Sequence, residues 1–174
     1  MRSVSCDDET FARLIGEGEL YDYELGERYV VAPAAGGSHA FLQAEIIGVL
    51  RGALNGGRVA GPTNLGVLGE PGRRWYVVPD VVVFPRDTQV QNAAFLYALV
   101  AVEIRSPREN IEAKLADYRA VAERTGLVVG EVWYIDGATL TVHPGAGSEG
   151  ETGWPEALAA VQHAVARWQE QAQR

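Results

Sequence analysis

The sequence contains one cysteine, Cys6, in a chain of 174 residues. An internal disulfide needs two cysteines and a Cys-rich zinc site needs more, so both are excluded. The apolar runs are well short of the ~20 residues that span a bilayer. The opening residues, MRSVSCDDETF, lack the basic and then apolar layout of a secretory signal. We therefore expect a cytoplasmic protein in which Cys6 is an incidental thiol.

Lysine is equally scarce, since Lys114 is the one lysine among 15 basic residues and the other fourteen are arginines. Acidic residues number 23, which gives a formal net charge of -8. Neutralisation of phosphates by Lys and Arg dominates unspecific DNA binding, so this charge argues against a protein that coats DNA. A local basic rim remains compatible with it.

The length and the 47% hydrophobic composition suit one core and one domain. Two nearly continuous apolar runs, residues 75–84 and 95–104, are typical of central strands covered on both faces. The other expected elements are a short helix at 8–18, a hairpin at 21–33 around Gly26, a helix from the N-cap Ser38 to 54, a Gly-rich strand at 58–69, a turn at 70–74, a helix from the cap Asn110 to Gly126, and paired strands at 131–136 and 139–143 around Asp136-Gly137. This order predicts an α/β fold, more fully an α+β mixed sheet with helices on both sides.

The chain is predicted to divide into a main domain at residues 1–144, a flexible linker at 145–153 and a C-terminal segment at 154–174. That segment carries an amphipathic helix whose inward positions are Leu158, Val161, Val165 and Trp168. Trp154 and Trp168 fit two alternatives equally well, packing on the same domain or forming an interface with a partner subunit.

Each of the two apolar runs contains one carboxylate, Asp80 in the first and Glu103 in the second. Burial of an unpaired carboxylate costs several kcal/mol or forces its protonation, so something must compensate for it. For either acid alone, an Arg partner or a place at a wet strand end is the simpler explanation. For the two together, 23 residues apart on consecutive strands, we favour a hard divalent cation completed by a backbone carbonyl and waters, as magnesium prefers.

The segments Pro79-Asp80 and Glu103-Ile104-Arg105 resemble the signature of the PD-(D/E)XK nuclease superfamily, with Arg105 where Lys is usual. A longer series, over roughly residues 20 to 143, is similar to the Uma-type restriction endonuclease family. Its fragments are Gly26-Glu27, Ala32-Pro33, Ser38-His39-Ala40, Pro79-Asp80, Val102 to Pro107, Lys114 to Tyr118 and Glu131 to Asp136. The resemblance implies a restriction-endonuclease-like core.

The resemblance also implies a site and a reaction. Asp80 and Glu103 become metal ligands, the carbonyl of Ile104 a possible third ligand, and Lys114 the catalytic basic residue, displaced from the strand to the next helix. The implied cofactor is Mg²⁺, with Mn²⁺ as a substitute, and the implied reaction is hydrolysis of DNA phosphodiester bonds. A permanently charged Arg105 suits phosphate binding, whereas a compact, titratable ammonium can orient or deprotonate water.

Two departures from the family leave an alternative open, a nuclease fold that no longer cuts and serves as a binding or assembly module. Asn110 stands where the family commonly has Asp, which keeps the helix cap but removes a charge. The loop at 106–110 is also shorter than usual. The sequence has no nucleotide-phosphate loop, no Ser/His/Asp arrangement and no zinc pattern, so neither an organic cofactor nor another metal hydrolase is indicated.

Further candidates each have a simpler alternative. Glu27, His39 and Glu45 could be accessory site residues, against a solvated strand charge, a capping or packing His and a helix-surface charge beside Arg51. Arginines near the strand ends could contact phosphate, against the alternative of scattered surface charges; they are Arg73, Arg74, Arg86, Arg105 and Arg108. Nuclease folds of this kind commonly act as dimers, so a homodimer is expected.

Overall fold

The protein was analysed as a computed structural model that describes residues 4–6, 29–31, 37–54, 58–67, 75–85, 88, 95–105, 110–147 and 154–172. The elements in chain order are β1 (Val4–Cys6), β2 (Tyr29–Val31), α2 (Gly37–Ala53), β3 (Arg58–Ala60), β4 (Leu65–Val67), β5 (Trp75–Val77), β6 (Val81–Phe84), β7 (Tyr97–Ile104), α3 (Ile111–Thr125), β8 (Val128–Asp136), β9 (Thr139–Pro144) and α4 (Pro155–Ala172).

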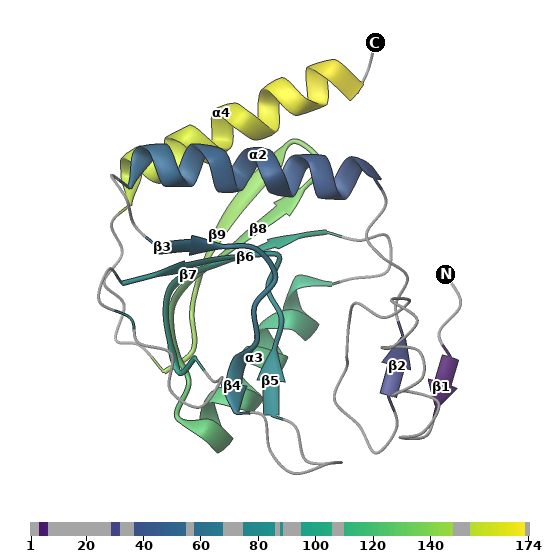
Figure 1. Cartoon of the computed structure of the whole chain (residues 1–174), viewed down its shortest axis with the longest axis vertical. Coiled ribbons are helices and arrows are strands. Elements are labelled where there is room, and N and C mark those ends of the chain that lie inside the picture. The colour runs from purple at the N-terminus through teal and green to yellow at the C-terminus, as the bar shows by residue number, and fades with distance from the viewer. Residues whose placement is uncertain are drawn as a thin grey trace.

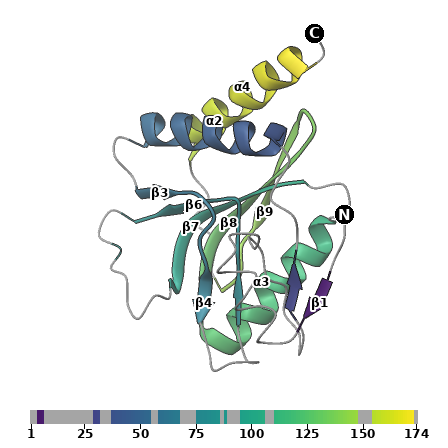
Figure 2. The ribbon, with the colours of Figure 1, turned by 45° about the vertical axis from the view of Figure 1, so that its right-hand side comes forward.

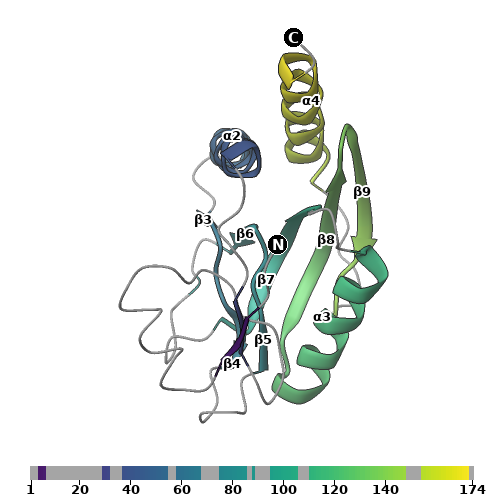
Figure 3. The same cartoon turned by 90° about the vertical axis from the view of Figure 1, so that its right-hand side faces the viewer.

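The central sheet has five strands in the order β3-β6-β7-β8-β9. β7 and β8 are parallel, and the other neighbours in this sheet are antiparallel. Helices α2 and α4 lie together on one side of the sheet and α3 lies on the other (Figures 1 and 2). Figure 3 shows α3 running along β8. The predicted mixed sheet with helices on both sides is confirmed.

Two buried clusters, one on each side of the sheet, hold these layers together. On the first side α2 contributes Leu42, Ile46 and Leu50, spaced four residues apart, and α4 contributes Val161 and Val165. On the second side the cluster includes Tyr118 and Val121 of α3. The strands between them are apolar on both faces, as the continuous runs in the sequence indicated. These layers fix the ends of β6 and β7, where the candidate site lies.

The predicted strands at 58–69 and 75–84 are each broken in the middle, which corrects the expectation of continuous strands. β3 pairs with β6 in the central sheet, and β4 pairs with β5 in a separate two-stranded sheet. The register is nevertheless the same in both pairs, since Arg58 lies opposite Phe84 and Leu65 opposite Val77. The four strands are therefore one long hairpin, interrupted at residues 61–64 and 78–80.

Proline explains the position of this interruption. By the shared register, Pro62 lies opposite Asp80 and Pro79 opposite Thr63. Neither proline has an N–H group to donate to the ladder, so the hairpin loses a donor on each strand at two adjacent levels. Asp80 consequently lies at a bend directly before β6, and not inside a strand as the sequence suggested.

The helix boundaries follow their sequence signals closely. α2 begins at Gly37, so the predicted N-cap Ser38 lies one residue inside the helix. The Asn110 cap of α3 is confirmed, because its Oδ1 accepts a hydrogen bond from the Glu112 N–H at 2.7 Å. Gly126 ends α3 in the left-handed conformation, with φ 74°. Gly137 provides the left-handed position of the β8–β9 turn, with φ 59°.

Several expectations fall on residues outside the described parts of the chain, namely the helix at 8–18, the turn at 70–74 and residues 21–28 and 32–33 of the hairpin. Tyr29–Val31 is a strand, and it pairs antiparallel with β1, a strand that was not predicted. The predicted linker begins with residues that are held in place, since Gly145 N–H donates to Gly130 O at 3.0 Å and Val129 N–H donates to Ala146 O at 2.8 Å. Residues 148–153 are not described.

The C-terminal helix packs on the chain's own core. Trp154 and Trp168 are partly buried against the cluster on the α2 side of the sheet. Arg167 of α4 donates from Nη2 to Oε1 of Glu45 on α2 at 3.0 Å. Both tryptophans therefore serve the fold of this chain. None of the described helices is long and apolar enough to cross a membrane.

Candidate active site

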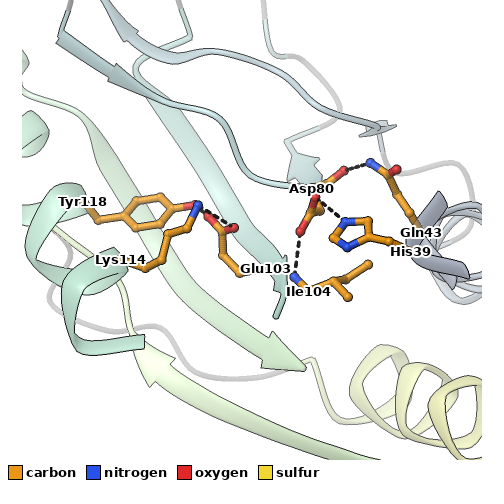
Figure 4. A network of polar contacts seen from close by, with 7 residues as sticks. All are labelled: His39, Gln43, Asp80, Glu103, Ile104, Lys114 and Tyr118. Carbon is orange, nitrogen blue, oxygen red and sulfur yellow. Dashed lines mark hydrogen bonds and ion pairs between the residues drawn. The ribbon is translucent and has the colours of Figure 1, made fainter. Parts of the chain in front are cut away.

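Asp80 lies at the bend before β6, where the start of that strand meets the end of β7. Its Oδ2 accepts the backbone N–H of Ile104 at 2.7 Å, and its Oδ1 lies 2.8 Å from Nε2 of His39 on α2. Gln43, one turn further along α2, donates from Nε2 to the Asp80 carbonyl at 2.6 Å (Figure 4). The Asp80 side chain is 22% exposed. It is thus oriented by two elements while remaining open to solvent.

Glu103 lies inside β7 and is 2% exposed. Its Oε1 accepts a hydrogen bond from the hydroxyl of Tyr118 at 2.8 Å, and its Oε2 lies 3.4 Å from Nζ of Lys114. Both partners come from α3, where they are four residues apart and so lie on one face of the helix (Figure 4). The free energy cost of burying this carboxylate is offset by a charge and a hydrogen bond.

The two acidic residues occupy adjacent backbone positions where β6 meets β7. Val81 lies opposite Val102 in the antiparallel β6–β7 pair, so the next position of this register places Asp80 opposite Glu103. Figure 4 shows α2 reaching Asp80 from one side and α3 reaching Glu103 from the other. Each acid is therefore held by a helical pair at i and i+4, His39 with Gln43 and Lys114 with Tyr118.

The electrostatics of the site favour a neutral tyrosine. Burial, and then the negative charge of Glu103, raise the pKa of Tyr118 well above its usual value. The phenol therefore keeps its proton and remains a hydrogen-bond donor. On the same helix, burial raises the pKa of Asp117, against the opposing effect of Lys114. The carboxylate compensation predicted from the sequence thus comes in part from His, Lys and Tyr side chains.

The donor set can be compared with the needs of a magnesium ion. Asp80 and Glu103 supply hard carboxylate oxygens at adjacent positions, and a carboxylate oxygen that already accepts one hydrogen bond has a further lone pair. In the part of the chain that the structure describes, no third His, Cys, Asp or Glu joins them in a group able to hold a metal. The residues fit magnesium in kind, with the remaining ligands left to a backbone carbonyl such as that of Ile104 and to water.

The other predicted site residues have different surroundings. Arg105 donates from Nη1 to Oδ2 of Asp136 at 2.6 Å, and this contact raises the pKa of Arg105. Glu45 is paired with Arg167, and Arg51 donates to the Val59 carbonyl, so Glu45 is a helix-surface charge with another partner than expected. The candidates outside the described residues are Glu27, Arg73, Arg74, Arg86 and Arg108.

Two residues in contact with the acids were not predicted as part of the site, Gln43 and Tyr118. A signal for both exists in the sequence, because each follows a candidate site residue by four positions: Gln43 follows His39 and Tyr118 follows Lys114. On a helix this spacing places two side chains one above the other. A search for polar partners at i+4 would have found them.

The five-stranded mixed sheet with helices on both sides, and with an acid on each strand segment where β6 meets β7, has the architecture of the restriction-endonuclease-like fold. The chain belongs to the Uma2 family, described as "Putative restriction endonuclease", whose profile matches residues 8–159. A crystal structure of "a putative nuclease belonging to DUF820" from Anabaena variabilis is similar, with a TM-score of 0.50 and 16% sequence identity. The similarity covers 66% of this chain and 66% of that chain, and it supports the fold. No curated protein matches the sequence.

Proposed function

We propose that the protein is a cytoplasmic, magnesium-dependent endonuclease that hydrolyses DNA phosphodiester bonds, with Asp80, Glu103 and Lys114 as its catalytic residues. The observations that carry this proposal are that Asp80 directly precedes the Val81–Val102 pair of the β6–β7 ladder and that its Oδ2 accepts the backbone N–H of Ile104, the residue after Glu103. Lys114 lies 3.4 Å from Glu103 and belongs to the same small group. The family supports a nuclease in general.

A bound magnesium ion would polarise the scissile phosphate and lower the pKa of a coordinated water. Asp80 and Glu103 would hold the ion, and other side chains of the protein would orient the water and the phosphate. Lys114 reaches Glu103 with its ammonium, and its side chain is 23% exposed. A partly exposed ammonium held by a buried carboxylate can donate to a phosphate oxygen or orient an attacking water. His39 and the Ile104 N–H keep both Asp80 oxygens in a fixed orientation.

Arg105 is the described arginine closest in sequence to the acids, and we propose it as a phosphate contact. It is exposed, and its partner Asp136 is exposed as well. An exposed ion pair contributes ~1 kcal/mol or less to stability, so a phosphate can compete for the guanidinium at small cost. A homodimer, as in other nucleases of this fold, belongs to the same proposal; light scattering of the purified protein would test it.

A second candidate function is supported by the same geometry. Both oxygens of Asp80 and both oxygens of Glu103 already contact protein groups. Asn110 stands where the family commonly has Asp, and Arg105 stands where the PD-(D/E)XK superfamily motif usually has Lys. A module that binds or assembles without cutting would retain the fold and this network while no longer taking up metal.

Calorimetric titration of Mn²⁺ separates the two functions. We would titrate the wild type, Asp80→Ala and Glu123→Ala, in which an exposed carboxylate of α3 outside the site is removed, and then assay plasmid nicking by all three. If the protein is an endonuclease, we expect the wild type and Glu123→Ala to bind Mn²⁺ and nick the plasmid. Asp80→Ala should lose both activities. Absence of binding by the wild type at millimolar Mn²⁺ would leave the non-catalytic module as the function.

A further inference from the structure

Tyr118 makes a closer contact with Glu103 than the catalytic lysine does. Its hydroxyl is 2.8 Å from Oε1, whereas the Lys114 ammonium is 3.4 Å from Oε2. Tyr118 is 1% exposed, and its ring belongs to the buried cluster on the α3 side of the sheet. The reaction proposed above gives this residue no role.

We propose that Tyr118 is a positioning residue that fixes the Glu103 carboxylate through Oε1 and leaves Oε2 as the oxygen that ligates the metal. This inference rests on the proposed function, because it concerns the same site. It assigns different tasks to the two oxygens of one carboxylate.

The rigidity of the two partners supports this division. The terminal torsion of a glutamate is broad and roughly two-fold, so an unheld carboxylate exchanges its oxygens easily. A buried tyrosine that is packed into a core has little freedom to release its acceptor. Lys114 has a flexible stem and is 23% exposed, so its ammonium can move from Oε2 towards solvent or substrate.

Charge supports the same division. The Tyr118 hydroxyl is a neutral donor, and its contact with Oε1 adds no positive charge that would repel a divalent cation. The Lys114 ammonium would repel a cation at Oε2, so the proposal requires it to move away from this oxygen when metal binds, which its partly exposed and flexible side chain allows. Residues that hold a metal ligand in place commonly change affinity or activity ~10- to 100-fold when they are removed. Tyr118 is placed to have an effect of this size on the metal without contacting it.

Tyr118→Phe tests the proposal because it removes one oxygen and keeps the ring in the core. Tyr97→Phe is the matched control, since Tyr97 lies on the same strand as Glu103 and is 46% exposed. Glu103→Ala completes the set. The first measurement is the Kd for Mn²⁺ by calorimetry on the metal-free proteins, with the unfolding temperature measured in parallel. If Tyr118→Phe does not fold at 25 °C, all four proteins are compared in sucrose, which favours the compact state.

We expect Tyr118→Phe to bind Mn²⁺ ~10- to 100-fold more weakly than the wild type and Tyr97→Phe to bind as the wild type does. Raising Mn²⁺ by the same factor should restore nicking to Tyr118→Phe but not to Glu103→Ala. A merely structural tyrosine would lower the unfolding temperature without changing the Kd, and that result overturns the positioning role while the nuclease stands. Absence of Mn²⁺ binding by the wild type overturns both.

Discussion

Glu103 shows at the scale of one residue how a site can be both buried and polar. A carboxylate that is 2% exposed in the middle of a sheet is stable only if hydrogen bonds or opposite charges replace its water. Tyr118 provides a hydrogen bond and Lys114 provides an opposite charge. The same contacts that allow the carboxylate to be buried also orient it, so stability and function depend on the same atoms.

Lys114 is the residue whose replacement should separate catalysis from folding. Because the ammonium would act on water or phosphate in the transition state, Lys114→Ala should lower the initial rate of plasmid nicking by ~10²- to 10⁴-fold. The nicking rate of Lys114→Arg should exceed that of Lys114→Ala by less than ~10-fold, since a planar guanidinium does not replace a compact ammonium. Arg119→Ala removes an exposed charge from the same helix and should retain full activity. Wild-type rates in Lys114→Ala would contradict the assigned role.

Tyr118 also predicts a pH dependence of stability. Its pKa in the folded chain is raised above the unfolded value of about 10. When the pH rises through 10, the unfolded chain therefore loses this proton while the folded chain keeps it, which favours unfolding. The stabilisation that Tyr118 contributes is complete below pH ~10 and is lost above it.

The measurement for this prediction is the free energy of unfolding in urea for the wild type and Tyr118→Phe between pH 8 and 11. The advantage of the wild type over the variant should shrink as the pH rises above ~10. A constant difference across the range would mean that the hydroxyl titrates alike in both states.

At the scale of elements, the start of α3 decides where Lys114 lies. Asn110 caps the helix through Oδ1, and Lys114 N–H donates to the Asn110 carbonyl at 3.2 Å. Asn110→Ala should therefore reduce the free energy of unfolding by ~1 kcal/mol. Asn110→Asp should keep the cap and gain from a negative charge at the helix N-terminus. Urea unfolding of the three proteins gives the test, and equal midpoints for Asn110→Ala and the wild type would contradict the cap.

The close approach of β7 and β8 gives a second prediction at this scale. A Cβ added at Gly130 would lie 2.5 Å from the Leu99 carbonyl oxygen, an atom of the backbone that cannot turn away. Gly130→Ala should destabilise the protein by ~1 to 3 kcal/mol. Gly48 on α2 has nothing within 4 Å of an added Cβ, so Gly48→Ala should instead stabilise by ~0.5 to 1 kcal/mol. Thermal unfolding of both variants, with shifts of opposite sign, would confirm the argument.

At the scale of the whole molecule, the parts of the fold with strong local signals could be predicted. The caps Asn110 and Gly126 bound α3 as expected, and the apolar run at 95–104 became β7. The break between β5 and β6 could not be foreseen, because it depends on Pro62 and Pro79 meeting across a hairpin. Pairing of β1 with β2 lacked a signal because it joins short segments far apart in sequence.

In the candidate site, too, features with a local sequence signal could be predicted and contacts between distant segments could not. The resemblance in the order of short motifs predicted Asp80, Glu103 and Lys114 as one group, and the structure brings Glu103 and Lys114 into contact. The partners of the acids depend on which helix face meets the sheet, and no single motif contains that information. His39 was a candidate from the sequence, and Gln43 and Tyr118 follow candidates at i+4, but which acid each of them contacts is decided by the placement of α2 and α3 on opposite sides of the strands.

The net charge of the whole chain predicts how an endonuclease of this kind would bind DNA. With a formal net charge of -8, the surface as a whole repels phosphate, and few cations are available to release counterions. In EDTA, the wild type should bind a labelled duplex in 150 mM salt more weakly than ~10⁻⁵ M, as for other unspecific contacts. Mn²⁺ should strengthen binding in the wild type and leave Asp80→Ala unchanged, because the cation adds positive charge only where the site holds it. Fluorescence anisotropy over a series of salt concentrations measures both quantities; tight binding in EDTA with a steep salt dependence would instead indicate a basic surface independent of the acids.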